Sequence, residues 1–230
     1  TILNRKLSEF HDRQDKIFLY TIPFHHNPTG ICMSEHSKLI LAKLCDRFHH
    51  FYVLSDEVYQ FLQWCDTDAN NEPLANYHDH IVSMGTFSKI LAPSLRVGWI
   101  FCCNNDNQSF ILNKLNSCAL LDSSGGLNTL GCLIVEQLIK NNKLDKYIET
   151  CINFLSSRCK KMIQYLNENK SMHIEKSFIK PEGGYFLWLK LNVEHTKDLL
   201  QLAIFNKVKF HNGDKFSCKD NFKDYVRLSF

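Results

Sequence analysis

Short apolar runs alternate with longer amphipathic stretches along the first two-thirds of the chain. Apolar runs bounded by turn residues predict four strands, at 17–24, 51–54, 80–84 and 97–102. After the first run, Ser34 is a good N-cap, and the apolar positions that follow it have helical spacing. Strands that alternate with helices are typical of a mainly parallel sheet covered by helices, so the predicted fold class is α/β.

The last third of the chain has a different pattern. A helix is predicted at 127–140, and the pair Asn141-Asn142 interrupts it. A longer helix follows at 144–167, long enough to connect two domains, and then come a strand at 184–191, a helix at 196–207 and a strand at 225–230. We therefore predict a large domain at 1–142, followed by a connector helix and a small α+β domain at 143–230.

Composition excludes several classes of partner. Hydrophobic residues make up 44% of the 230 residues and charged residues 22%, the balance of an ordinary globular protein. The net charge is only +3, and the lysines and arginines are scattered, so we expect no nucleic-acid partner. The longest apolar runs, such as 97–103, are far short of a membrane span, so we expect no membrane partner.

Ten cysteines raise the question of disulfides or zinc. They form no C-x-x-C pair and no zinc-finger spacing, so they are interpreted as reduced thiols in a reducing compartment. A cytoplasmic location is expected, with a mitochondrial one as the alternative. The pairs His25-His26 and His49-His50 lack both i,i+4 spacing and a carboxylate partner, so no metal is expected.

Four groups of polar residues fall at the ends of the predicted strands or in the loops after them. They are Asn27-Pro28-Thr29-Gly30, Ser55 to Tyr59, the block from Gly85 to Trp99 around Lys89, and Arg227. Open α/β sheets bind ligands at this edge. Each group also has a structural explanation: a turn, the acidic first turn of a helix, a solvated lysine and an edge charge. Taken separately, the structural explanations are the better ones.

Taken together and in this order, the groups resemble the fold-type I pyridoxal-phosphate aminotransferases of class I/II. The family's motifs stand here at Pro23 to Gly30, Asp56 to Tyr59, Ser88 to Gly98 and Arg227. Gly183 to Trp188 is similar to the family's small-domain strand, and the lysine block is most similar to the 2-aminoadipate and kynurenine aminotransferase branch. The resemblance implies a three-layer, mainly parallel sheet of an incomplete large domain plus the small α+β domain.

The resemblance also implies a role for each matching residue. Lys89 would hold pyridoxal 5'-phosphate (PLP) as a Schiff base and act as general acid and base, which requires burial and cationic neighbours. Asp56 would keep the pyridine nitrogen protonated, and Asn27 and Tyr59 would bind the ring's phenolate oxygen. Thr86, Ser88 and Arg96 match phosphate-binding positions. Arg227, with Asn27, would bind the substrate carboxylate.

Two departures from the family pattern affect what we expect. The chain covers about half of the family's usual length, without the segment that supplies the phosphate cup and the aromatic that stacks on the cofactor, so a fragment of a longer protein is expected. In His211 to Phe216, Asn212 replaces a proline of relatives, and the turn then depends on Gly213. A homodimer is implied by the resemblance alone.

The function expected is transfer of an amino group from an α-amino acid, for example 2-aminoadipate or an aromatic one, to a 2-oxo acid. Such a reaction belongs to amino-acid metabolism or biosynthesis. Two alternatives remain: a PLP-dependent carbon–sulfur lyase on the same scaffold, since the pocket selects among outcomes, and a non-catalytic fragment or partner subunit.

Overall fold

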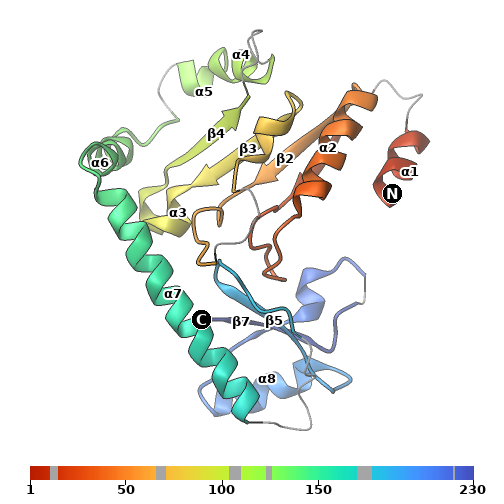
Figure 1. The fold of residues 1–230 in the computed structure, drawn as a ribbon, viewed down its shortest axis with the longest axis vertical. Coiled ribbons are helices and arrows are strands. Elements are labelled where there is room, and N and C mark those ends of the chain that lie inside the picture. Colours follow the sequence, from red (N-terminus) through yellow and green to blue (C-terminus); the bar gives the residue numbers. More distant parts are fainter. Residues whose placement is uncertain (11–14, 66–70, 104–109, 123–125, 170–177, 220) are drawn as a thin grey trace. The chain divides into compact units, whose positions relative to one another are not determined.

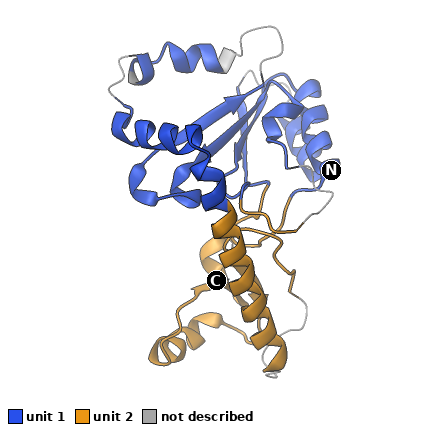
Figure 2. Ribbon diagram, turned by 60° about the vertical axis from the view of Figure 1, so that its left-hand side comes forward, with its two compact units in different colours: residues 1–23, 33–61, 66–148 blue, residues 24–32, 62–65, 149–230 orange. Residues whose placement is uncertain are grey.

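The computed structural model describes residues 1–10, 15–65, 71–103, 110–122, 126–169, 178–219 and 221–230. These residues form two compact units, coloured separately in Figure 2. Unit 1 comprises 1–23, 33–61 and 66–148, and unit 2 comprises 24–32, 62–65 and 149–230. This division differs from the predicted boundary after residue 142, because two early segments pack with the C-terminal unit and the boundary falls inside a helix.

Unit 1 is built on a four-stranded sheet in the order β1-β2-β3-β4 (Figure 1). The strands are β1 Ile17–Thr21, β2 Phe51–Asp56, β3 Ile81–Thr86 and β4 Gly98–Cys102. The first three run parallel, whereas β4 is antiparallel to β3. The sequence prediction of a mainly parallel α/β sheet is confirmed.

The core of unit 1 lies between one face of this sheet and helix α2 (Glu35–Arg47). Ser34 caps the helix by accepting a hydrogen bond from the amide of Ser37, as its N-cap position predicts. Alternate residues of β2 point into the core, so Phe51 and Val53 are buried. Residues from α1 (Ile2–Glu9), α2 and the short 3₁₀ helix at Leu74–Tyr77 complete this cluster: Leu7, Leu41, Leu44, Cys45, Leu74 and Ala75.

The opposite face of the sheet is more open. Phe18 and Tyr20 of β1 are 58% and 57% exposed, and they lie on the same face as Tyr52 of β2. The rings of Phe18 and Tyr52 stack with their centroids 5.6 Å apart. This face carries Asp56 as well, since Tyr52 and Asp56 are an even number of positions apart.

Helices make up most of the remainder of unit 1, and the last of them, at Lys143–Glu168, continues into unit 2. The short helices are α3 Phe87–Ile90, a 3₁₀ turn at Pro93–Leu95, α4 Phe110–Asn116 and α5 Ala119–Asp122. Helix α6 (Thr129–Lys140) and helix α7 (Lys143–Glu168) confirm the predictions at 127–140 and 144–167. The interruption falls at the predicted asparagine pair, where Asn142 adopts a positive φ of 52°.

Unit 2 contains a three-stranded antiparallel sheet in the order β5-β7-β6. The elements are β5 Phe186–Lys190, α8 Thr196–Phe205, β6 His211–Asn212, a 3₁₀ turn at Gly213–Phe216 and β7 Tyr225–Ser229. Leu187, Leu189 and Val226 are buried in its core. Together with α7, this is the small α+β arrangement that the sequence predicts, and the turn that begins at Gly213 forms with Asn212 before it.

Three further properties concern the described part of the chain. No helix there is both long and apolar enough to cross a membrane. Its cysteines, which are all ten of the sequence, are free thiols. Within the same ranges, no group of three or more histidine, cysteine or acidic side chains is arranged to hold a metal ion.

Candidate active site

The sheet of unit 1 brings the first group of predicted site residues to one edge. Asp56 is the last residue of β2, and it pairs with Met84 of the parallel neighbour β3. Thr86 ends β3, and Lys89 lies in the short helix that follows. Because the carboxyl ends of parallel neighbours meet at the same edge, Asp56 and the lysine segment share it. Figure 1 shows helix α3 following β3 at this edge.

Asp56 is held by a residue that the sequence prediction did not single out. The hydroxyl of Tyr20, on the adjacent strand β1, donates a hydrogen bond to Asp56 Oδ2 at 2.5 Å. Tyr59 lies in the turn directly after β2 and is only 5% exposed. Asp56 and Tyr59, predicted to bind opposite edges of one ring, therefore come from the same strand end.

Glu57 is a second residue that the sequence analysis missed. It is 3% exposed, and its Oε1 accepts hydrogen bonds from Ser55 Oγ at 2.7 Å, Ser83 Oγ at 2.6 Å and the amide of Leu74 at 2.8 Å. Its own amide donates to the carbonyl of Met84 at 2.8 Å. Desolvation raises the pKa of Glu57, and the three hydrogen bonds oppose that rise. The network ties β2 to β3 next to Asp56.

The loop after β3 gathers the predicted phosphate-binding side chains. Thr86 Oγ1 caps helix α3 by accepting from the amide of Ser88 at 3.1 Å, and it donates to the carbonyl of Val97 at 3.2 Å. Arg96 adopts a left-handed conformation, with φ of 50°, and its Nη1 donates to Ser88 Oγ at 3.2 Å and to the carbonyl of Pro93 at 3.1 Å. Two hydroxyls and a guanidinium thus lie together, the donors that bind a phosphate well.

Lys89 follows this cluster in α3, and its side chain is exposed. The burial that the sequence analysis required for its acid–base role is therefore not present in the structure. The residues just before Lys89 are nevertheless tightly packed against Trp99 of β4. A Cβ atom added to Gly85 would lie 2.1 Å from the indole of Trp99, and that indole packs against Phe87 with centroids 4.8 Å apart.

The remaining predicted site residues, Asn27 and Arg227, lie in unit 2 and contact each other. Arg227 Nη1 donates to Asn27 Oδ1 at 2.7 Å across a sequence separation of 200 positions. The guanidinium carbon lies 4.1 Å from the ring centroid of Phe186 and 4.9 Å from that of Phe216. These cation–π contacts with two aromatic rings hold the guanidinium in place. A guanidinium held in this way is suited to donate hydrogen bonds to a planar anion such as a carboxylate.

Asn27 is positioned by the turn that it begins. Gly30 has a positive φ of 71°, and a Cβ atom there would lie 3.0 Å from the carbonyl oxygen of Phe186. Glycine is required at this position for both reasons. His26 Nδ1 lies 2.9 Å from Thr29 Oγ1 and closes the same turn. This packing on β5 explains why residues 24–32 belong to unit 2.

His25 is a buried histidine to which the sequence analysis gave no structural role. It is 1% exposed, and a Cβ atom on Gly183 would lie 2.1 Å from its ring. Cys32 Sγ lies 3.3 Å from Nδ1, and Nε2 has no hydrogen-bond partner among the described residues. Desolvation by burial lowers the pKa of His25 to about 4. Gly183 and Gly184, which the family motif contains, are the sequence signal that a large side chain packs there.

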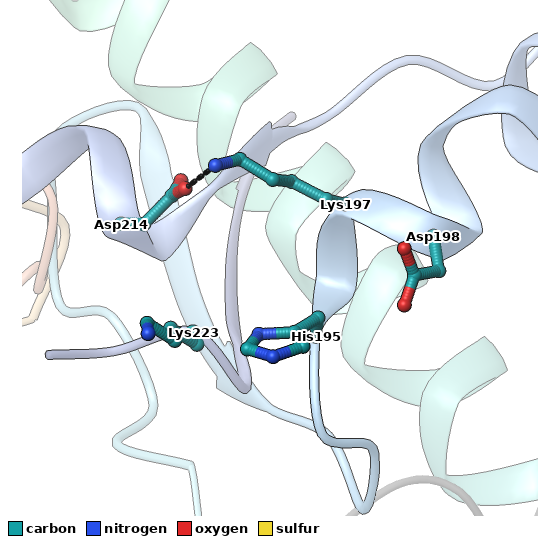
Figure 3. Close-up of a pocket in the computed structure, with 5 residues that line it drawn as sticks. All are labelled: His195, Lys197, Asp198, Asp214 and Lys223. Carbon is teal, nitrogen blue, oxygen red and sulfur yellow. Dashed lines mark ion pairs between the residues drawn. The ribbon is translucent and has the colours of Figure 1, made fainter. Parts of the chain in front are cut away.

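A pocket of about 270 Å³ lies elsewhere in unit 2 and is drawn in Figure 3. Its lining residues are charged or titratable: His195, Lys197, Asp198, Asp214 and Lys223. Lys197 Nζ and Asp214 Oδ2 form an ion pair at 2.6 Å. The hydrogen bond from Lys197 lowers the pKa of Asp214. None of the residues predicted for catalysis lines this pocket.

The fold and these residues define a class of protein. The chain belongs to the aminotransferase class I and II family, which matches residues 2–230. It is 30% identical to aromatic-amino-acid aminotransferase 1 of Thermococcus litoralis over 100% of this chain and 53% of the relative. A kynurenine aminotransferase of Pyrococcus horikoshii, solved in complex with PMP, is 28% identical with a TM-score of 0.83, over 100% of this chain and 55% of that one.

A third similar protein is a transcriptional regulator. The HTH-type transcriptional regulator NorG of Staphylococcus aureus is 24% identical over 92% of this chain and 46% of the regulator. The chain spans about half the length of the curated relatives that it matches. The family prediction made from the motifs is confirmed.

Proposed function

We propose that the protein is a PLP-dependent aminotransferase that moves an amino group from an α-amino acid to a 2-oxo acid, with Lys89 as the residue that holds the cofactor. One observation carries the proposal. Asp56 and the segment from Thr86 to Arg96 share the carboxyl edge of two parallel strands, and they bring a carboxylate, a lysine and a set of phosphate donors together.

The donors present fit the two ends of the proposed cofactor. A phosphate requires several hydrogen-bond donors and positive charge, and Thr86, Ser88 and Arg96 supply both within one hydrogen-bonded loop. A protonated pyridine nitrogen requires an anionic acceptor, and Asp56 supplies it at the end of β2. Tyr59, buried after the same strand, is suited to hold the ring's phenolate oxygen.

When bound, PLP supplies an electron sink for the bond broken at the substrate's α-carbon. Lys89 would then have two tasks: its Nζ would hold the aldehyde carbon between turnovers, and, once its exposed side chain is covered, it would move a proton from the substrate's α-carbon. Asp56 holds the proton on the pyridine nitrogen. The net reaction balances, since one amino acid becomes a 2-oxo acid while a second 2-oxo acid becomes an amino acid.

Arg227 gives the proposal its substrate class. Its guanidinium, which lies over the rings of Phe186 and Phe216 and donates to Asn27, is suited to bind an α-carboxylate through hydrogen bonds. An aromatic amino acid is the proposed donor, because similar proteins include an aromatic-amino-acid and a kynurenine aminotransferase. 2-Aminoadipate is the alternative donor, from the resemblance of the lysine block. A homodimer is proposed from the family alone.

The test begins with a visible absorption band after PLP is mixed with the protein. The band is expected in wild type, absent in Lys89→Ala and retained in Lys140→Ala, which removes an exposed lysine of α6 paired with Glu136. Phenylalanine or 2-aminoadipate should then convert the bound cofactor to its amine form. A wild-type protein that forms no band with PLP would rule out the proposed function.

Two alternatives have their own signatures. A carbon–sulfur lyase on the same residues would release pyruvate and ammonia without a 2-oxo acid acceptor. A non-catalytic role in regulation is favoured by one observation, the similarity to the regulator NorG. In that case PLP would bind, but an amino acid would not release a 2-oxo acid.

A further inference from the structure

Tyr20 contacts a residue of the proposed cofactor site, although no motif points to it. Tyr20 pairs with Leu54 in the parallel register of β1 and β2, and Leu54 and Asp56 face the same side of the sheet. Tyr20 is therefore the diagonal neighbour of Asp56, a separation that an aromatic side chain can bridge. The hydroxyl reaches Asp56 Oδ2 at 2.5 Å.

The chemistry of this contact is well defined. A tyrosine hydroxyl that is protonated is a donor, and a carboxylate is an acceptor only. Desolvation, the hydrogen bond to Asp56 and the neighbouring negative charge of Asp56 and Tyr59 raise the pKa of Tyr20 to about 12. The Tyr20 hydroxyl therefore keeps its proton at neutral and moderately alkaline pH. The hydrogen bond restricts rotation of the Asp56 carboxylate.

We propose that Tyr20 is a positioning residue for Asp56, with its hydroxyl holding Oδ2 so that Oδ1 is left to accept from the protonated nitrogen of the cofactor. The proposal rests on the proposed function, because it assigns Asp56 to that nitrogen. Tyr20 does not touch the reacting atoms, so its effect passes through Asp56. A ligand-binding side chain needs other residues that fix its orientation, in addition to its own contact with the ligand.

The open face of the sheet offers a matched control. Tyr52 lies on the same face of β2, and its ring stacks on His80 with centroids 4.6 Å apart. It precedes Asp56 by four positions, about 13 Å along a strand. Tyr20→Phe and Tyr52→Phe each remove one phenol oxygen from one face of one sheet, and only the first removes a bond to Asp56.

The experiment measures PLP affinity and the pH midpoint of the visible band of the lysine-bound cofactor, in the protein loaded with PLP. Tyr20→Phe should weaken PLP binding about tenfold, the effect of losing one hydrogen bond to a charged group. A less stable pyridinium withdraws fewer electrons, so the midpoint should move upward, toward that of Asp56→Asn. Tyr52→Phe should change neither quantity.

Coupling to Asp56 is the decisive readout, because a purely structural role would not produce it. In an Asp56→Asn background, Tyr20→Phe should weaken PLP binding less than about twofold. An equal loss in both backgrounds, or an unchanged midpoint in Tyr20→Phe, would overturn the assignment of Tyr20 while the wild-type band leaves the proposed function intact. A wild type without any band would overturn both.

Discussion

Replacement of His25 by asparagine tests how burial couples to protonation in unit 2. His25 is enclosed by Gly183, Gly184 and Cys32, and burial lowers its pKa to about 4 from an ordinary value near 6.5. Asparagine cannot be protonated, and it tolerates the positive φ of 47° at this position better than most residues. The variant therefore removes the proton-binding group and keeps the backbone conformation.

The size and sign of the effect follow from the two pKa values. The folded state binds the proton more weakly than the unfolded state, so acid favours unfolding. The stability is complete above about pH 6.5, falls as the pH decreases, and levels off below about pH 4. The two pKa values of His25, near 6.5 in the unfolded state and about 4 in the folded state, correspond to about 3 kcal/mol in the free energy of unfolding. About 2 kcal/mol of this stability is lost between pH 7 and pH 5.

The assay is chemical denaturation at pH 7 and pH 5, followed by tryptophan fluorescence from Trp64 and Trp188 of the same unit. Between pH 7 and pH 5, the free energy of unfolding should fall by about 2 kcal/mol less in His25→Asn than in wild type. Comparing the losses cancels any constant packing defect that asparagine causes. His36→Asn, which replaces an exposed histidine of α2, serves as the control. Equal pH dependence in wild type and His25→Asn would refute the assignment of the acid response to His25.

Three further predictions concern packing and charge. Glu57→Ala should lower the free energy of unfolding by about 3 kcal/mol, because three buried donors lose their acceptor, and Glu57→Gln should restore more than half in the same denaturation assay. Gly85→Ala should lower the free energy of unfolding by about 2 kcal/mol, since Trp99 must move away from the added methyl group. Adding Trp99→Leu should restore most of this loss. A double variant that is no more stable than Gly85→Ala would contradict the predicted clash. Lys197→Met should lower the free energy of unfolding by less than about 1 kcal/mol at pH 7, because the Lys197 side chain is 67% exposed and solvent screens its ion pair with Asp214. That cost should disappear as acid protonates Asp214, whose pKa is lowered in the folded state, and a cost that persists at pH 2 would exclude the ion pair as its source.

Local signals explain which elements the sequence predicts well. The spacing of apolar positions predicted a helix at 144–167, and α7 spans Lys143–Glu168. Ser34 was predicted as an N-cap and is one. A short helix has few periodic positions to reveal it, so α1 (Ile2–Glu9) and α4 (Phe110–Asn116) were not predicted. Long elements can be predicted from the periodicity of their apolar positions, whereas short helices depend on contacts with neighbouring elements.

The sequence by itself determined the family and supplied the proposed site residues, because the family's motif residues follow one another in a fixed order and type. Tertiary structure alone decided which side chains hold them in place. Tyr20 meets Asp56 only through the register of two strands, and Arg227 meets Asn27 across 200 positions. Burial and hydrogen bonding depend on such non-local contacts, and no local pattern of residues encodes them.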